Sequence, residues 1–242
     1  MKNYKLIIQY DGTEYAGWQI QEKCNTVQQT ITDAIELLLN EKINLIGSGR
    51  TDSGVHAAGQ VANFRTENVI DIYRFKHSLN SILPYSISIK KMDEVSLDFH
   101  ARYDAKRRIY FYLISNTKSP FFRNYSYFYH KEIDLPKLNY LSKIITGTND
   151  FTSFSRKNSE VENRICTVYQ IGWRKIRELI LFYIKADRFL HGMVRTIAGT
   201  LLRSQELPEP EIYLNRIFEL RNRESAFEAV PAKGLFLYKV EY

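Results

Sequence analysis

Cysteine, long apolar runs and targeting segments are scarce in this sequence. Its 242 residues include only Cys24 and Cys166, too few for a disulfide scaffold and too widely separated for a zinc-ligand spacing. The longest apolar run, Leu179 to Ile184, is far shorter than the roughly 20 residues of a membrane-spanning helix. The N-terminus has no apolar core followed by a small-residue cleavage site, as a secretory signal would have. We therefore expect a cytoplasmic protein that does not associate with membranes.

Common catalytic and cofactor motifs are also missing. The five histidines form neither an H-x-x-H nor an H-E-x-x-H metal pattern, and no G-x-S-x-G nucleophile elbow occurs. The phosphate-binding patterns G-x-x-x-x-G-K-[ST] and G-x-G-x-x-G are absent as well. These absences predict that the protein uses neither a metal nor a nucleotide cofactor.

Positive charge and aromatic side chains are plentiful. The chain has 34 Lys and Arg against 27 Asp and Glu, a net charge of +7, and it contains 17 tyrosines and 14 phenylalanines. Aromatic rings interleaved with cations suit exposed bases and phosphates, so a nucleic-acid partner is one interpretation. The alternative is that tyrosines fill sheet faces and that modest basicity only keeps the protein soluble.

Strand and helix patterns alternate in both halves of the chain. Hydrophobic periodicity predicts strands at 4–10, 43–48, 59–66, 107–115, 166–173 and 179–185, and helices from about 26 to 38, 71 to 80, 135 to 145 and 188 to 202. This order favours an α+β fold over a doubly wound one. We expect two similar lobes, residues 1–100 and 101–242 with a boundary near 94–106. They would share one mostly antiparallel mixed sheet, with helices on one face and a basic cleft on the other.

The last of these helices is expected to be amphipathic. Its apolar face would bury Leu190, Val194, Ile197 and Leu201, while its opposite face would carry Arg188, His191 and Arg195. Because those three are spaced three and four residues apart, the pattern predicts a cationic stripe along one helix.

A glycine-rich loop at residues 47–54 is the most unusual segment. Its glycines flank Arg50 and Asp52 between two apolar strands, so Asp52 would be presented at the end of a sheet with Arg50 near enough to keep it ionised. The competing interpretation is a solvated turn stabilised by Ser and Thr hydroxyls, which is the more common role for such an Asp.

Six collinear motifs resemble the TruA family of tRNA pseudouridine synthases. They are DGTEYAGWQ at 11–19, GRTDSGVHA at 49–57, FHAR at 99–102, YFY at 110–112, RFLHGMVR at 188–195 and PAKGL at 231–235. The sequence departs from the family pattern at Asn149, Gly192 and Thr196, which puts contacts at the cleft wall in doubt but leaves the catalytic position intact.

The resemblance implies an isomerase that converts uridine to pseudouridine at positions 38–40 of the tRNA anticodon stem-loop, as a homodimer without cofactor. Asp52 would be the catalytic carboxylate, acting either as a nucleophile or as a base that removes a sugar proton. Tyr110 would stack on the flipped uracil, Arg195 would pair with Asp52, and Arg50 would help to displace the nucleotide. Without the resemblance, Tyr110 would read as a strand-face tyrosine and Arg195 as a solvated or phosphate-binding cation.

Further cations are expected to bind the RNA. The family match assigns substrate contacts to Arg188, His191, Lys106 and Arg108, and adds Arg107, Arg156, Arg164 and Arg203 as candidates for phosphate contacts. Two other functions stay open: a tRNA-binding folding chaperone that has lost catalysis, and an Asp-nucleophile hydrolase. The hydrolase would require a second carboxylate or a metal motif that the sequence does not show.

Overall fold

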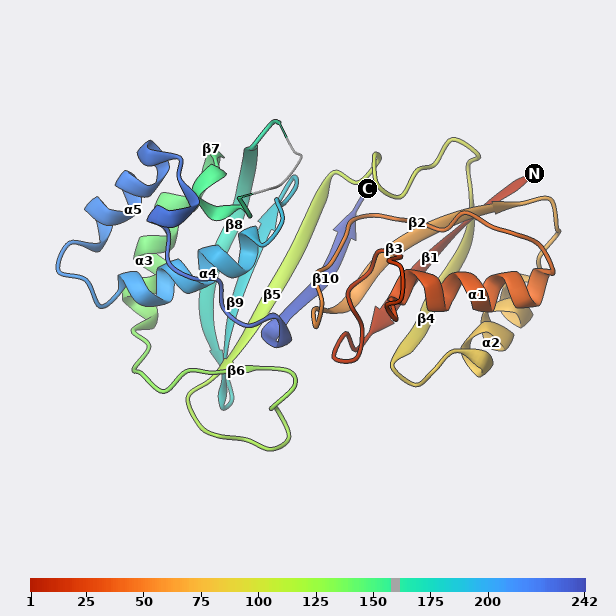
Figure 1. The fold of residues 1–242 in the computed structure, drawn as a ribbon, viewed down its shortest axis with the longest axis horizontal. Coiled ribbons are helices and arrows are strands. Elements are labelled where there is room, and N and C mark those ends of the chain that lie inside the picture. The colour runs from red at the N-terminus through yellow and green to blue at the C-terminus, as the bar shows by residue number, and fades with distance from the viewer. Residues whose placement is uncertain (158–161) are drawn as a thin grey trace. The chain divides into compact units, whose positions relative to one another are not determined.

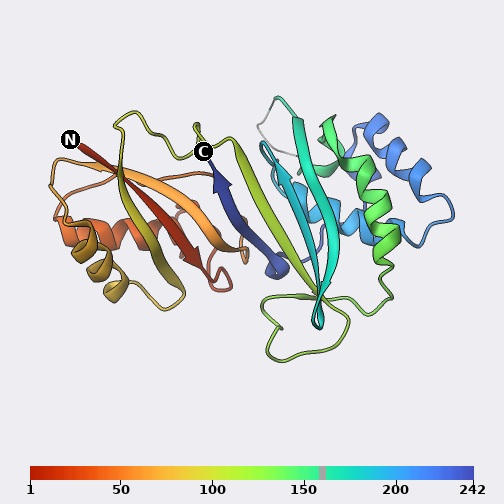
Figure 2. The ribbon, with the colours of Figure 1, turned by 180° about the vertical axis from the view of Figure 1, so that it is seen from behind.

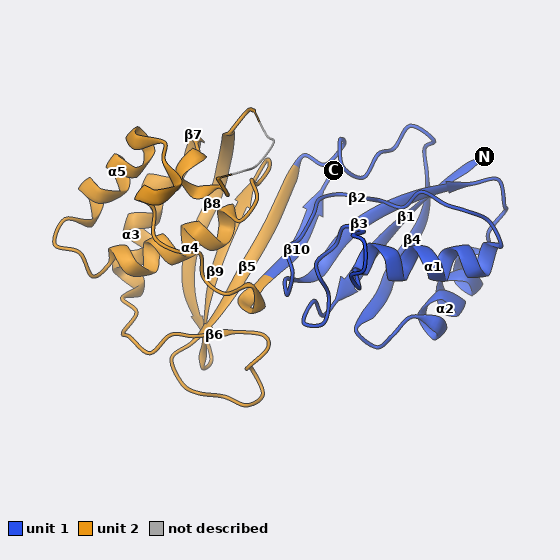
Figure 3. Cartoon of the chain, in the orientation of Figure 1, with its two compact units in different colours: residues 1–106, 236–242 blue, residues 107–235 orange. Residues whose placement is uncertain are grey.

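The computed structural model describes residues 1–157 and 162–242, which form ten β-strands and five α-helices (Figure 1). The chain divides into two compact units, residues 1–106 with 236–242 and residues 107–235 (Figure 3). This division differs from the expected lobes because the C-terminal residues return to the first unit. Among the described residues, none of the helices has the length and apolar character to cross a membrane.

Unit 1 is a sheet with two helices. Its strands have the order β4-β1-β3-β10, and β2 pairs with β3; only β10 runs parallel to its neighbour β3. The helices α1 and α2 lie in front of this sheet in Figure 1 and behind it in Figure 2, and α2 contacts β4. The elements are β1 (Lys2–Tyr10), α1 (Val27–Leu39), β2 (Ile46–Gly47), β3 (His56–Thr66), α2 (Ile72–Ile82), β4 (Ile87–Val95) and β10 (Leu235–Glu241).

Unit 2 has the same kind of architecture. Its strands have the order β5-β9-β8-β7, all antiparallel, and the short β6 pairs in parallel with β5. The helix α4 lies in front of β8 and β9 in Figure 1 and behind them in Figure 2, while α3 contacts β8. The elements are β5 (Arg107–Ser115), β6 (Tyr127–Phe128), α3 (Leu135–Ile145), β7 (Gly147–Asp150), β8 (Ile165–Ile176), β9 (Leu179–Ala186), α4 (Met193–Ser204) and α5 (Pro210–Leu220).

The α+β class and the mostly antiparallel sheet are confirmed. The strand at 107–115 and the helix at 135–145 have the expected bounds, and α1 begins after Thr26, whose hydroxyl caps the backbone N–H of Gln29. The strand expected at 43–48 is reduced to Ile46–Gly47.

The expected helix from Arg188 is wrong at its start. Helix α4 begins at Met193, and Gly192 before it has a φ of +74°, a left-handed conformation that ends any helical path from upstream. Arg188 and His191 therefore lie in the preceding loop, and the cationic stripe along one helix does not exist. The apolar face is present, since Val194, Ile197 and Leu201 are buried on α4 and Leu190 is buried ahead of it.

Candidate functional site

The Asp52 loop, residues 48–55, connects β2 to β3 in unit 1 and is held by its neighbours on both sides. The hydroxyls of Tyr10 and Thr51 are 2.8 Å apart, and the Trp18 backbone N–H donates to the Thr51 carbonyl at 3.1 Å. Past Asp52, the Ser53 hydroxyl and the Gly54 N–H both donate to the Tyr15 carbonyl, at 3.2 and 3.3 Å. These bonds fix the backbone on either side of Asp52, which is what a catalytic carboxylate requires.

The motif at 11–19 packs against the Asp52 loop and allows its backbone to be held in this way. Gly17 has a φ of +103°, and a Cβ on it would lie 2.5 Å from the Thr51 carbonyl oxygen. Only glycine allows both this backbone conformation and such a close approach. The 11–19 and 49–57 motifs are therefore one structural feature, in which the first supports the second.

His56, at the start of β3, closes the other end of the loop. Its buried ring stacks on Phe236 with a centroid distance of 4.6 Å, and its Nδ1 accepts a hydrogen bond from the Gly12 N–H at 3.0 Å when the ring is neutral. A protonated Nδ1 would instead donate to Asp11 Oδ1, which lies 3.1 Å away. His56 is thus a packing residue under the Asp52 loop.

Asp52 itself is half-buried and Arg50 is exposed. Thr51, Val55 and His56 around Asp52 are buried, while Ser53 is exposed and its hydroxyl helps to hold the turn, as the competing interpretation of a hydroxyl-stabilised turn also expects. The arrangement presents one carboxylate from a rigid backbone, which suits a nucleophile or a base.

Tyr110 lies on β5 in unit 2 and is 8% exposed. Its ring makes an edge-to-face contact with Phe189, at 5.1 Å between centroids and 87° between planes. Tyr112, two residues along the same strand face, is fully buried and donates its hydroxyl to the Pro231 carbonyl at 2.8 Å. Burial raises the pKa of Tyr112, and the positive charge of Arg195 opposes that rise. Arg195 is therefore close to the tyrosine face of β5.

The Arg195 guanidinium on α4 is oriented by the segment before β10. Its Nε donates to the Val230 carbonyl at 2.8 Å, while the Val230 N–H donates to the Arg195 carbonyl at 3.2 Å. These two hydrogen bonds fix the Arg195 residue, which is half-buried. Arg195 is therefore not a freely solvated cation.

Asp187 accepts hydrogen bonds from two of the predicted RNA-binding arginines, Arg108 and Arg188. Its carbonyl accepts from Arg108 Nη1 at 3.0 Å, and its carboxylate accepts from the backbone N–H groups of Arg188 and Thr167 at 2.6 and 2.9 Å. Sequence reasoning missed Asp187, Phe189 and Val230. Asp187 could have been noticed because it directly precedes the RFLHGMVR motif, whereas Val230 acts through its backbone and leaves no side-chain signal.

The other predicted RNA-binding residues are mostly at the surface. Lys106, the last residue of unit 1 before β5, is exposed, and so are His191 and Arg156, which are joined by a bond from the Arg156 N–H to the His191 carbonyl at 3.0 Å. Arg107 lies 4.9 Å over the Tyr169 ring and Arg203 lies 5.3 Å over the Phe227 ring.

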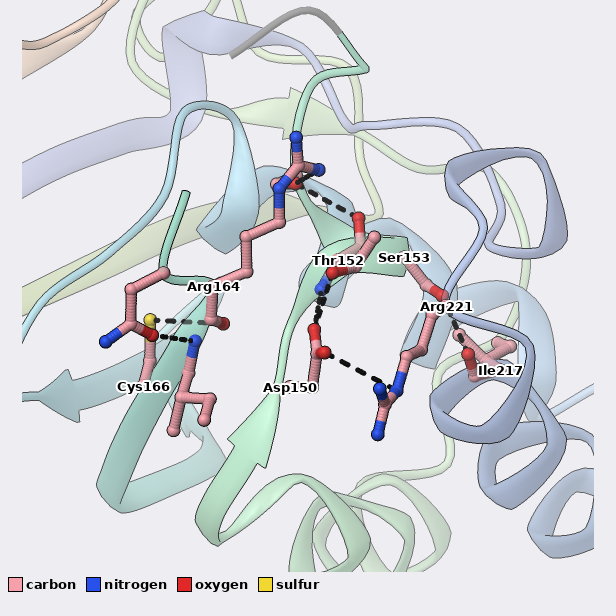
Figure 4. Close-up of polar contacts among 10 residues, drawn as sticks. Asp150, Thr152, Ser153, Arg164, Cys166, Ile217 and Arg221 are labelled. Carbon is pink, nitrogen blue, oxygen red and sulfur yellow. Dashed lines mark hydrogen bonds and ion pairs between the residues drawn. The ribbon is translucent and has the colours of Figure 1, made fainter. Parts of the chain in front are cut away.

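Arg164 lies in a cluster of polar contacts around Asp150 in unit 2 (Figure 4). The Asp150 carboxylate accepts from the Thr152 hydroxyl at 2.5 Å and from the Thr152 N–H at 2.9 Å, and it is 3.4 Å from Arg221 Nε. These contacts, the Thr152 hydroxyl first, keep the pKa of Asp150 below its usual value although partial burial opposes them. Arg164 Nη1 donates to the Ser155 hydroxyl at 3.1 Å. Asn149 pairs across the strands with buried Cys166. Among the described residues, no three His, Cys, Asp or Glu side chains are grouped as metal ligands.

The chain is similar to proteins of one family. The family model described as tRNA pseudouridine synthase matches residues 6–104 and 141–242, ranges that contain Asp52 and Arg195 but not Tyr110. The tRNA pseudouridine synthase A of Acetivibrio thermocellus is 42% identical over 251 residues, and that of Caldicellulosiruptor bescii is 44% identical over 246 residues. Each alignment covers 100% of this chain and 100% of the relative.

Among solved structures, a chain in the crystal structure of the archaeal box H/ACA sRNP Nop10-Cbf5 complex has a TM-score of 0.39 and 12% identity. The match covers 95% of this chain and 58% of that chain.

Proposed function

The chain belongs to the tRNA pseudouridine synthase family, and on that premise we propose that it isomerises uridine to pseudouridine at positions 38–40 of the anticodon stem-loop, with Asp52 as the catalytic carboxylate. The observation that carries the proposal is the Asp52 loop, whose backbone is hydrogen-bonded on both sides of a half-buried carboxylate.

The reaction needs no group from outside. The bond between C1′ and N1 of the uridine breaks, the uracil turns, and a bond forms between C1′ and C5; the C5 proton leaves and N1 gains a proton. Asp52 starts this sequence either by attacking the sugar or by removing a sugar proton to form a glycal. Both routes require an ionised carboxylate, and both require the base to leave its stack, at a cost of a few kcal/mol as an order of magnitude.

Tyr110 and Arg195 act on the same uridine in this proposal. Tyr110 stacks on the uracil and helps to remove the C5 proton after rearrangement. Its support is the contact with Phe189, which holds its ring in one orientation. Arg195 keeps Asp52 charged and aimed, and its support is the Val230 carbonyl that fixes its Nε. Arg50 displaces the flipped nucleotide, consistent with its exposure next to Asp52 in sequence.

RNA binding is assigned to cations of both units. Lys106, Arg108, Arg188 and His191 contact the tRNA, and binding weakens as salt rises because bound counterions are released. A homodimeric state and a cytoplasmic location are further predictions of the family match, and gel filtration at several concentrations tests the first.

The experiment incubates the purified protein with uridine-labelled tRNA and measures pseudouridine and release of the C5 proton. We expect Asp52→Asn to abolish turnover while the Kd for tRNA stays within about tenfold, or ~1.4 kcal/mol. Asp98→Asn is the matched control, since Asp98 is an exposed carboxylate of the same unit.

The result also separates the alternatives. Tight tRNA binding by the wild-type protein with no pseudouridine would indicate the folding chaperone. Equal loss of turnover and affinity in Asp52→Asn would show that Asp52 is structural rather than catalytic.

A further inference from the structure

The segment between β5 and β6, residues 116–126, is an ordered loop. At its base, Asn116 Nδ2 donates to the carbonyls of Tyr129 and Lys131 at 3.0 and 2.9 Å. Within it, the backbone N–H groups of Tyr125 and Ser126 both donate to the Phe122 carbonyl, at 3.0 and 2.9 Å. Figures 1 and 2 show this loop projecting away from the sheet and helices of unit 2. These hydrogen bonds hold the projecting loop in one backbone conformation.

Aromatic side chains are exposed along this loop and the strand that follows. Phe121 is 85% exposed, Phe128 is 47% exposed and Tyr125 is 37% exposed. Exposed rings grouped on one ordered loop indicate an interaction surface, because a solitary domain gains nothing from leaving them in water. These residues lie between the two ranges matched by the family model, 6–104 and 141–242.

The charge of the loop selects the kind of partner. Residues 116–131 contain Lys118, Arg123 and Lys131 and no Asp or Glu. Lys131 is 2.5 Å from Glu206, whereas Lys118 and Arg123 form no ion pair with any residue that the structure describes. A second copy of the chain docked loop to loop would bring like charges together, but a polyanion would complement them.

A cavity of about 440 Å³ adjoins the end of the loop in unit 2. Tyr127 and Phe227 line it, and Arg203 lies over the Phe227 ring. Glu228 lines the same cavity, where its carboxylate would accept from base amino groups and disfavour phosphates. Its size and aromatic walls suit one unpaired base next to the cationic loop.

We propose that this loop, with the adjoining cavity, binds unpaired nucleotides of the RNA substrate through stacking on Phe121 and phosphate contacts from Lys118 and Arg123. The proposal rests on the proposed function, since it names a second contact to the same RNA. Stacking on exposed aromatics is sequence-tolerant, so this contact adds affinity without selecting a base.

The test measures the Kd for an unmodified tRNA transcript in the Asp52→Asn background. We expect Phe121→Ala to weaken binding at least about fivefold, and Phe121→Tyr to retain it because the ring is kept. The slope of log K against log salt is negative, and the K118A/R123A variant should reduce its magnitude by about 1.4. The matched controls are Tyr73→Ala, which removes a ring 78% exposed on α2, and K76A/K90A, which removes two unit 1 cations.

The outcomes are distinct. Unchanged tRNA binding by both loop variants, together with pseudouridine formation by the protein that retains Asp52, would overturn this proposal and leave the proposed function standing. A shift of Phe121→Ala from dimer to monomer in light scattering, with unchanged RNA affinity at equal protomer concentration, would show that the loop is an interface between copies. Failure of the wild-type protein to bind tRNA at all would instead contradict the proposed function.

Discussion

At the scale of single residues, Gly17 combines a left-handed backbone conformation with a close approach to the Asp52 loop. A Cβ at this position would lie 2.5 Å from the Thr51 carbonyl oxygen and 3.1 Å from the Asp52 carbonyl carbon, on a backbone with a φ of +103°. We expect Gly17→Ala to lower the free energy of unfolding by roughly 1–3 kcal/mol or more and to reduce pseudouridine formation further, because the loop must move to relieve the contact. Chemical denaturation and the tRNA assay measure the two effects.

Gly147 provides a matched control for this substitution. It has the same φ of +103°, but the nearest atom to its added Cβ is Asn149 Nδ2 at 4.0 Å. Gly147→Ala therefore introduces the backbone strain without a backbone clash. Equal loss of activity in both variants would show that Gly17 does not act through the Asp52 loop.

Several residues of the candidate site could be predicted from the sequence, but the contacts that support them could not. Asp52 could be singled out because a carboxylate between glycines and apolar strands is unusual, and the family motifs then pointed to Tyr110 and Arg195. The contacts that orient them could not be read from the sequence, since Val230 acts through backbone atoms and Phe189 contacts Tyr110 across the fold. Such partners are set by tertiary packing, which local patterns do not encode.

At the scale of elements, a short polar network ties the end of β6 to the end of α4. The Tyr129 hydroxyl donates to Glu206 Oε1 at 2.8 Å, and Lys131 pairs with the same carboxylate. Burial, with help from Glu206, raises the pKa of Tyr129 from 10.0 to about 12. Glu206 has a lowered pKa, chiefly because of its hydrogen bond with Lys131.

This network predicts a pH dependence of stability. Because the pKa of Tyr129 is raised on folding, its contribution is fully present below pH 10 and is lost as pH rises through about 12. We expect Tyr129→Phe to be less stable than wild type at pH 9, by about 1 kcal/mol for the lost hydrogen bond, and the difference to shrink between pH 10 and 12. Urea titrations across that range measure it. A difference that stays constant with pH would show that the Tyr129 proton plays no part.

Helices and strands could be predicted from the sequence where a single hydrophobic period continued over the whole element. Strand β5 and helix α3 are such cases. Strand β4 was missed because its register shifts opposite Ile7 and Ile8, which places buried Ile89 and Met92 three residues apart and breaks the period of two. The predicted start of helix α4 was too early because the apolar spacing continues upstream to Leu190. Gly192 has a left-handed backbone between Leu190 and the true start of the helix.

At the scale of the whole molecule, the positive charge belongs to one unit. Unit 2 has 21 Lys and Arg against 13 Asp and Glu, a net charge of +8, while unit 1 has 13 against 14, a net charge of −1. The overall charge of +7 is therefore the sum of a basic unit 2 and a nearly neutral unit 1. Electrostatic attraction of a polyanion should be directed to the unit that carries Tyr110 and Arg195 rather than to the unit that carries Asp52.

This asymmetry predicts that equal numbers of neutralised cations have unequal effects. We expect R107Q/R156Q in unit 2 to reduce the slope of log K against log salt for tRNA by about 1.4 to 1.8, because each lost phosphate contact removes about 0.7 to 0.9. K76Q/K90Q in unit 1 changes the net charge by the same amount and should leave the slope at its wild-type value. Fluorescence anisotropy over a series of salt concentrations measures both. Matching reductions in the two variants would mean that tRNA responds to total charge, and Arg107 and Arg156 would have to be abandoned as phosphate contacts.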